Sequence, residues 1–396
     1  MPHIVFNTST DLKTPTQCDG VLFKFIAKSF NFTQRPRKTE YKIAVESENQ
    51  EFLLTLKDKD SNTMLKADKP TRVTPVSIVK NALNTYAKVT NAHVIFSNTN
   101  NFSQKVEPQK EYLKDIEYFV NEFDTNKEIQ IEIGFGSGRH LIHQAKENPD
   151  VQFIGLEIHT PSIEQVLKQV NIQNITNILA VSYDARLFME FIKSNRVSKI
   201  FVHFPVPWDK KPHRRVYSSE FINEALRILK TDGTLELRTD SRKYFDYCVE
   251  LLTNLPKGKI TIDINKDLKV SSKYEDRWKK QGKNIYDVVL QCQQNDIDIS
   301  LEKDFSFEKL VNFNTIKTTI STTAIVEESF VLHIEDIFEI NENSGLIQLT
   351  LGSFNKPLNK YIYIHEGKAT YFQGNPIPTS ANLKAHHKLK EILFND

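Results

Sequence analysis

Three glycines at alternating positions form the motif with the clearest chemical meaning. The run Glu132-Ile-Gly-Phe-Gly-Ser-Gly138 follows an apolar strand pattern and precedes a helical pattern, a context in which glycines let the backbone approach a nucleotide-like ligand closely. Dinucleotide-binding loops have two residues between their second and third glycines, whereas single residues separate Gly134, Gly136 and Gly138. This spacing favours S-adenosyl-L-methionine over NAD, because a ligand without pyrophosphate presents less anion to the helix N-terminus.

Two acids follow at the ends of the next two strand patterns. Glu157 ends the pattern over 152–156, where a carboxylate can accept hydrogen bonds from both hydroxyls of a ribose, and Asp184 stands just beyond 178–181, within reach of an adenine amino group. The carboxyl ends of parallel strands meet at one edge of a sheet, so we expect the glycines and both acids to form one cofactor site. Taken singly, each could be a tight turn or a solvated acid.

A basic, proline-rich segment follows the fourth strand pattern. It reads Phe204-Pro-Val-Pro-Trp-Asp-Lys-Lys-Pro-His-Arg-Arg215 and would cross the sheet edge where a substrate faces the cofactor. The prolines stiffen the segment, since each sets φ near −65° and removes an amide donor. Basic residues such as Lys210 and Arg214 beside Trp208 suit phosphates with a base stacked nearby. The alternative is a solvated charge run around a core tryptophan.

The elements that must position these groups alternate between strand and helix. Short apolar runs separated by helical patterns predict an α/β fold with a mostly parallel sheet covered on both faces. The predicted parallel strands cover 129–133, 152–156, 178–181, 199–204 and 234–237. An alternating strand over 260–270 and a return strand over 285–291 predict an antiparallel pair that completes the sheet.

The length of 396 residues indicates two or three domains at roughly 150 residues each. A polar stretch over 97–104 resembles a linker, and the pattern turns to short strands after about residue 296. We therefore predict an N-terminal α+β extension over 1–105, a central domain over 106–295 and a small, mostly β domain over 296–396.

Composition excludes several classes of protein. Lys and Arg number 52 against 50 Asp and Glu, so any affinity for nucleic acid must come from a local patch. Cys18, Cys248 and Cys292 form no CxxC pair, which predicts neither a disulfide framework nor a metal site. Neither a secretory leader nor an apolar run of about 18 residues is present, so we expect a cytoplasmic protein with no membrane contact.

Several motifs, in their order and spacing, resemble the bacterial tRNA (guanine-N7-)-methyltransferase family over roughly residues 108–292. They read EIGFGSG, GLEIH, YDA, FPVPWDKKPHRR, RTDS and SKYE. The resemblance implies a class I, Rossmann-like methyltransferase fold with S-adenosyl-L-methionine as the methyl donor. It implies tRNA as the partner, with guanosine 46 of the variable loop as the acceptor.

The resemblance also implies roles for individual residues. The family's cofactor contacts match Glu132, Glu157 and Asp184, beside the three glycines. Its substrate contacts match Lys210, Asp240 and the segment from Ser272 through Tyr274 to Glu275, in which Ser272 stands where the family commonly has threonine.

One position departs from the family. Val206 stands between the two prolines where the family typically has aspartate, a candidate catalytic or methionine-binding acid; Asp209 lies nearby. Guanine N7 carries a lone pair and no proton, so its methylation needs placement and surrounding negative charge but no general base. We expect Asp240 and Glu275 to supply that charge. As alternatives, Asp240 could cap a helix and Glu275 could be an exposed loop acid.

Two other functions remain as alternatives. A methyltransferase acting on the exocyclic amine of another RNA base would need a polar residue in place of Phe204, so the sequence argues against it. An RNA-binding protein on a degenerate methyltransferase scaffold would explain Val206. Neither the tRNA species nor the choice between monomer and homodimer follows from the sequence.

Overall fold

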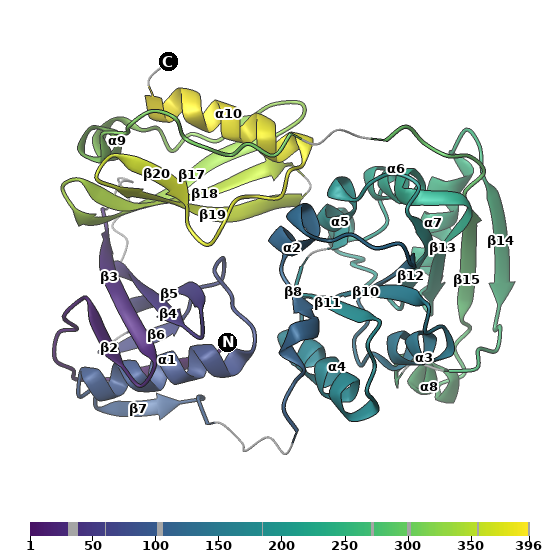
Figure 1. The fold of residues 1–396 in the computed structure, drawn as a ribbon, viewed down its shortest axis with the longest axis horizontal. Coiled ribbons are helices and arrows are strands. Elements are labelled where there is room, and N and C mark those ends of the chain that lie inside the picture. The colour runs from purple at the N-terminus through teal and green to yellow at the C-terminus, as the bar shows by residue number, and fades with distance from the viewer. Residues whose placement is uncertain are drawn as a thin grey trace. The chain divides into compact units, whose positions relative to one another are not determined.

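The computed structural model describes residues 1–30, 39–59, 61–100, 106–183, 185–270, 273–298, 302–354 and 356–394 (Figure 1). The chain forms two compact units. One combines Met1–Ser103 with Glu302–Asp396, and the other is Gln104–Leu301. In the described ranges, no helix combines the length and the apolar character needed to cross a membrane.

The unit from Gln104 to Leu301 is built on an eight-stranded sheet in the order β14-β15-β13-β12-β9-β10-β11-β8. Within it, β15 runs antiparallel to both of its neighbours, and the other pairs are parallel. The strands are β8 (Leu113–Lys114), β9 (Glu128–Ile133), β10 (Val151–Leu156), β11 (Ile178–Val181), β12 (Val197–His203), β13 (Leu229–Thr239), β14 (Lys259–Ile264) and β15 (Tyr286–Gln291). The α/β class and the antiparallel end of the sheet are therefore confirmed.

Helices cover both sides of this sheet. Figure 1 shows α3 (Arg139–Glu147) and α4 (Thr160–Gln173) on one side, and α6 (Ser219–Ile228) and α7 (Arg242–Thr253) on the other. Leu141 of α3 and Val166 of α4 pack in one buried apolar cluster with Phe153 of β10. The remaining elements here are η1 (Lys110–Tyr112), α2 (Ile116–Asn121), α5 (Ala185–Phe188), η2 (Met189–Phe191), η3 (Pro212–Arg214) and α8 (Lys273–Lys280).

Side chains alternate along the central strands, and the two faces of the sheet differ as a result. On β12, Ile200 and Val202 are fully buried, whereas Lys199 and His203 belong to the opposite face. Register aligns the polar face across strands, since Phe201 lies beside both Glu132 and Glu236. Around β12, the sheet is thus apolar on one face and polar on the face that lies toward α3.

The other unit is a 12-stranded sheet with the path β20-β19-β18-β17-β3-β4-β5-β6-β1-β7, from which β2 and β16 branch. Its strands are β1 (His3–Phe6), β2 (Thr16–Cys18), β3 (Val21–Ser29), β4 (Glu40–Ser47), β5 (Gln50–Lys59), β6 (Asn62–Ala67), β7 (Val94–Ser97), β16 (Ile325–Val326), β17 (Val331–Asn341), β18 (Ser344–Ser353), β19 (Lys356–His365) and β20 (Lys368–Tyr371). Its helices are α1 (Val76–Val89), α9 (Phe313–Thr319) and α10 (Ser380–Phe394).

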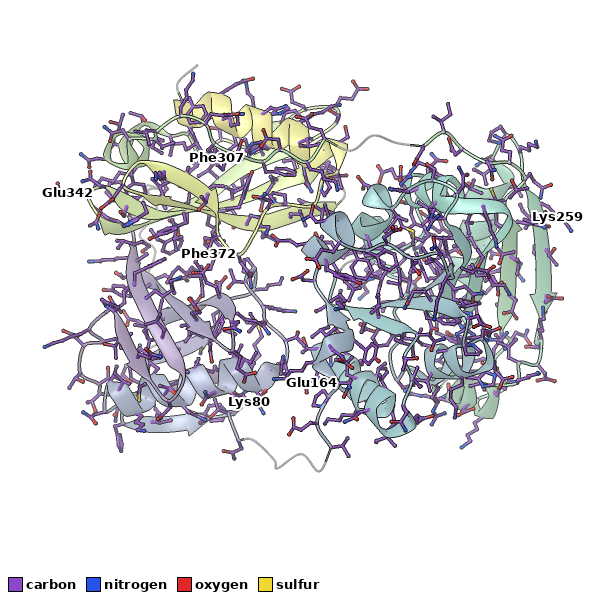
Figure 2. All side chains as sticks on the ribbon, viewed as in Figure 1. Lys80, Glu164, Lys259, Phe307, Glu342 and Phe372 are labelled. Carbon is purple, nitrogen blue, oxygen red and sulfur yellow. The ribbon has the colours of Figure 1, made fainter. Side chains whose placement is uncertain are left out.

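The N-terminal and C-terminal segments share this unit. Strand β17 pairs with β3, and Phe372, labelled in Figure 2, packs in a buried cluster with Leu53 and Ala27 from the N-terminal segment. A buried Lys42 donates to Asp68 at 2.8 Å, and Asp68 also accepts from the Tyr361 hydroxyl. The two outer segments thus form one sheet and share a buried cluster, besides the cluster that each has of its own. The three-domain division drawn from the sequence stays a prediction.

Candidate active site

The glycine loop joins β9 to α3 in a conformation that suits glycine. Gly134, Gly136 and Gly138 have φ values of 67°, 51° and 71°, in the left-handed region that side chains disfavour. Gly138 caps α3, and a Cβ placed there would lie 2.2 Å from Cγ2 of Val166. Gly138 is therefore required both by its backbone conformation and by the close packing of α3 against Val166 of α4.

Glu157 is attached to this loop by its carboxylate. Its Oε2 accepts from the Gly136 amide at 3.0 Å, and its Oε1 accepts from the amides of Ile158 and His159 at 2.8 and 2.9 Å. The side chain is half-buried at the end of β10, next to the glycines. The structure thus brings together the loop and the acid that the sequence assigned to ribose hydroxyls.

Glu132 occupies a different environment from Glu157. It is 3% exposed, and its Oε2 lies 2.8 Å from Nδ1 of His140, on the first turn of α3. Burial opposes a charge on His140, but the Glu132 carboxylate outweighs it, so the pKa of His140 is raised. Sequence patterns did not identify His140, because nothing in its spacing distinguishes it from His143 on the same helix.

Three further predicted site residues are Asp184, Ser272 and Tyr274. Asp184 and Ser272 lie outside the described residues. Tyr274 belongs to α8, which follows directly on Ser272.

The basic segment after β12 separates into exposed and structural residues. Lys210 and Arg214 are exposed, and the Arg214 guanidinium lies 5.3 Å from the Trp208 ring centroid. Arg215, in contrast, is 9% exposed, donates to the Pro207 carbonyl and lies 4.3 Å from the Tyr247 ring centroid. The charge run is therefore anchored by its last arginine, which leaves Lys210 and Arg214 available to a ligand.

Val206 and Asp240 are both accessible. Val206 is 60% exposed, and the Asp240 side chain is 19% exposed with its Oδ2 2.9 Å from Nζ of Lys283. Asp240 does not cap α7, because Ser241 is the capping residue and accepts from the Tyr244 amide. The alternative reading of Asp240 as a helix cap is therefore wrong.

Glu275 is buried, not an exposed loop acid. It is 1% exposed, and its Oε1 lies 2.8 Å from Nη2 of Arg238 and 3.0 Å from Nζ of Lys279. Arg238, which is also 1% exposed, donates through Nη1 to both oxygens of Asp287 at 2.6 Å. The sequence patterns did not identify Arg238, because β13 also contains Lys230, Asp232 and Glu236 and nothing in the spacing marks the arginine as buried.

Comparisons with known proteins bear on both units. Residues 126–288 match a family described as "Putative methyltransferase". A tRNA (guanine-N(7)-)-methyltransferase of Wolinella succinogenes is 42% identical over 397 residues, covering 99% of this chain and 100% of its own length. An enzyme of the same name from Helicobacter hepaticus is 36% identical, with all of both chains covered. The chain belongs to the tRNA (guanine-N(7)-)-methyltransferase family.

Membership confirms the family, the fold class and the enzyme class expected from the motifs. As a methyltransferase of this family, the chain uses S-adenosyl-L-methionine as its methyl donor, again as expected. Among solved structures, one titled "Structure of an antibiotic related Methyltransferase" covers 43% of this chain and 89% of its own, with 16% identity and a TM-score of 0.34. The alignments with the two relatives span both compact units of this methyltransferase.

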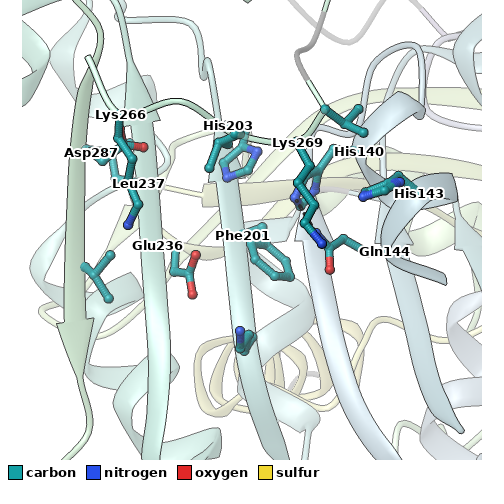
Figure 3. Close-up of a pocket in the computed structure, with 14 residues that line it drawn as sticks. His140, His143, Gln144, Phe201, His203, Glu236, Leu237, Lys266, Lys269 and Asp287 are labelled. Atoms are coloured by element: carbon teal, nitrogen blue, oxygen red, sulfur yellow. Dashed lines mark hydrogen bonds between the residues drawn. The ribbon is translucent and has the colours of Figure 1, made fainter. Parts of the chain in front are cut away.

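A polar pocket of about 230 Å³ lies on the sheet face beside α3, and its lining does not include the glycine loop or Glu157 (Figure 3). His140 and His143 line it from α3, His203 and Glu236 from the sheet, and Lys269 from the segment after β14. Within the described part of this methyltransferase, no three His, Cys, Asp or Glu side chains are grouped to hold a metal ion.

Proposed function

We propose that this chain transfers a methyl group from S-adenosyl-L-methionine to N7 of guanosine 46 in the variable loop of tRNA, in the cytoplasm. The observation that carries the proposal is the junction of Glu157 with the glycine loop, where the carboxylate accepts from the Gly136 amide at 3.0 Å. This junction lies in a chain that matches tRNA (guanine-N(7)-)-methyltransferases over its whole length.

The cofactor half of the site comprises the glycine loop and three acids. In this proposal Gly134, Gly136 and Gly138 let the backbone approach the methionine portion, since they have no side chains and can adopt the left-handed φ values of the loop. Glu157 accepts from the ribose hydroxyls, and Asp184 accepts from the adenine amino group. Glu132 supplies negative charge beneath the loop.

The substrate half comprises the basic segment, Asp240 and the segment from Ser272 to Glu275. Exposed Lys210 and Arg214 are positioned for tRNA phosphates, and Trp208 offers a ring face for stacking. Ser272 and Tyr274 contact the tRNA in this proposal. Because Glu275 is paired with Arg238, we propose that Glu275 fixes the position of α8, which follows Ser272, and does not contact guanine directly.

Methyl transfer to N7 requires the chain to place the guanine against the methyl group and to supply negative charge beside the purine. S-adenosyl-L-methionine supplies a methyl group on a positively charged sulfur. The N7 lone pair needs no base to expose it, so no residue has to remove a proton. Positive charge moves onto the purine as the methyl group is transferred, and a carboxylate at the guanine stabilises it. Asp240 is the accessible acid on this side, since Glu275 is almost completely buried.

Incubation of the purified protein with unmodified tRNA and isotopically labelled S-adenosyl-L-methionine tests the proposal. Mass spectrometry of the digested nucleosides should show labelled 7-methylguanosine. A matched tRNA with adenosine at position 46 should remain unlabelled. Label on a different nucleoside would favour methylation of another RNA base, and tRNA binding without any label would favour the degenerate-scaffold alternative.

A further inference from the structure

The Glu132–His140 pair joins the two ends of the glycine loop. Glu132 lies on β9 before the loop, and His140 lies on α3 after it. Both side chains are buried, at 3% and 8% exposed, and Nδ1 of His140 is 2.8 Å from the Glu132 carboxylate. A buried carboxylate needs a partner, because its desolvation is costly. His140 is therefore placed to hold both the acid and the geometry of the loop.

Charged and titratable groups from each neighbouring element face His140. They are Glu132 on β9, Lys199 and His203 on β12, Glu236 and Arg238 on β13, Asp287 on β15, His143 on α3, and Lys266 and Lys269 after β14. Burial works against a proton on His140, but the Glu132 carboxylate prevails and raises its pKa. Burial, with the nearby charges of His140 and Arg238, holds the pKa of His203 well below its usual value, so His140 is the histidine of this pair that binds a proton more readily.

The polar pocket gives this proton access to solvent. Figure 3 shows His140 at the pocket with His203 beside it, and their ring centroids are 4.5 Å apart. The side-chain amide nitrogen of Gln144, one turn further along α3, lies 3.3 Å from Nε2 of His140 and donates to it when that nitrogen carries no proton. The imidazole thus has one nitrogen on Glu132 and the other at the pocket, an arrangement that lets it gain or lose a proton without breaking its bond to Glu132.

We propose that His140 is a positioning residue for the methyl donor, which holds Glu132 beneath the glycine loop and releases its proton when the donor binds. The inference rests on the proposed cofactor role of this loop. The donor carries a sulfonium and an ammonium against one carboxylate, so it binds as a cation. A cation close to Glu132 competes with the imidazolium for the same carboxylate and lowers the pKa of His140. Binding must then release protons, and donor affinity must rise with pH.

Calorimetry of the full-length protein at pH 6.5 and 8.5, in buffers of different ionisation enthalpy, measures the donor affinity and the number of protons released on binding. Donor affinity should rise about five- to tenfold over this range with proton release. S-adenosyl-L-homocysteine, which lacks the sulfonium, should show a smaller rise. His140→Gln keeps a donor for Glu132 but cannot carry charge, so its affinity should be independent of pH and exceed that of the wild type at pH 6.5.

Two further variants separate the hydrogen bond that His140 makes to Glu132 from the charge that His140 can carry. His140→Ala removes the hydrogen bond as well, so it should bind the donor more weakly than His140→Gln at both pH values. His143→Gln changes the neighbouring histidine on the same helix and should retain the pH dependence of the wild type. If His140→Gln kept the wild-type pH profile and proton release, the inference would be wrong even though methylation stood. A wild type that binds the donor with proton release yet methylates no tRNA would refute the proposed substrate alone.

Discussion

In the proposed site, the cofactor half and the substrate half each bury one carboxylate against a basic side chain, and the two basic side chains differ in kind. Glu132 is paired with His140, and an imidazole is the side chain whose ordinary pKa lies closest to neutral pH. Glu275 is paired with Arg238, a guanidinium that keeps its charge at every physiological pH. The cofactor half is therefore suited to respond to a charged ligand, and the substrate half to hold a fixed geometry.

Each half also has one accessible acid, and these two are held differently as well. Glu157 accepts hydrogen bonds from three backbone amides, which fix its direction. Asp240 is paired only with the flexible, half-exposed side chain of Lys283 among the described residues. A contact with the ribose needs a rigid acceptor, whereas a charge that stabilises the purine can act over a range of positions.

The largest effect should follow from removing the fixed cation. Arg238→Met leaves Glu275 and Asp287 without their buried partner, which typically costs about 3 to 5 kcal/mol. Tryptophan fluorescence during urea unfolding measures this cost selectively, because Trp208 and Trp278 both belong to the unit from Gln104 to Leu301.

The control for this prediction is an exposed arginine on α7. Arg242 has a 66% exposed side chain paired with Asp246, so Arg242→Met should cost less than about 1 kcal/mol. Equal losses for Arg238→Met and Arg242→Met would show that the buried cluster does not stabilise this unit, and the contrast between the two halves would then fail.

The sequence predicted the parts of the fold that depend on local periodicity. The strand over 178–181 coincides with β11, because a short apolar run fully buried in a sheet has clear limits. The strand predicted over 260–270 was wrong in its length. Strand β14 ends at Ile264, because Asn265 turns with φ of 57°, and the apolar Leu268 and Val270 beyond it line the pocket beside α3 instead.

The local geometry was predictable where the backbone sets residue type, as at the three glycines and at Glu157 beside them. The geometry was not predictable where side chains from different elements form ion pairs with one another. Arg238 meets Glu275 from α8 and Asp287 from β15, a pairing that no spacing within the chain indicates. The sequence likewise treated Arg214 and Arg215 alike, although only tertiary packing decides that Arg215 is buried.

The next largest effect should appear at the accessible acid of the substrate half. Asp240→Asn keeps the shape and removes the charge, so kcat/KM for tRNA methylation should fall about ten- to a hundredfold, the loss of one charged contact. Binding of S-adenosyl-L-methionine should not change. Asp246→Asn, an exposed acid on α7, is the control. Full activity in Asp240→Asn would leave methyl transfer standing but would remove charge stabilisation by Asp240 from the mechanism.

A comparable or smaller effect should appear at the accessible acid of the cofactor half. Glu157→Ala removes the acceptor for the ribose and should weaken donor binding by about 1 to 3 kcal/mol in calorimetry. Exposed Glu147 at the end of α3 provides the control as Glu147→Ala. Unchanged affinity in a folded Glu157→Ala protein would mean that the ribose lies elsewhere, and measurable binding of NAD would contradict the reading of the glycine spacing.

The smallest effect should come from restoring the family aspartate at Val206. This side chain is 60% exposed, so Val206→Asp should alter stability by less than about 0.5 kcal/mol. If methylation of N7 needs placement and negative charge but no proton transfer, an additional acid has no essential step to perform. The rate on unmodified tRNA should then change by less than about threefold, the equivalent of 0.6 kcal/mol.

Val206→Asp also compares the responses of the two halves to an added charge. Val206 follows β12, and in the sheet order β12 lies between β10, which Glu157 follows, and β13, which Asp240 follows. An acid there would add negative charge to both halves, so donor affinity and kcat measured separately show which half responds. A wild type inactive on tRNA but activated by Val206→Asp would make the missing aspartate catalytic and would favour the degenerate scaffold. Activity in both proteins, lost in each when Asp240→Asn is added, would assign the charge at the guanine to Asp240.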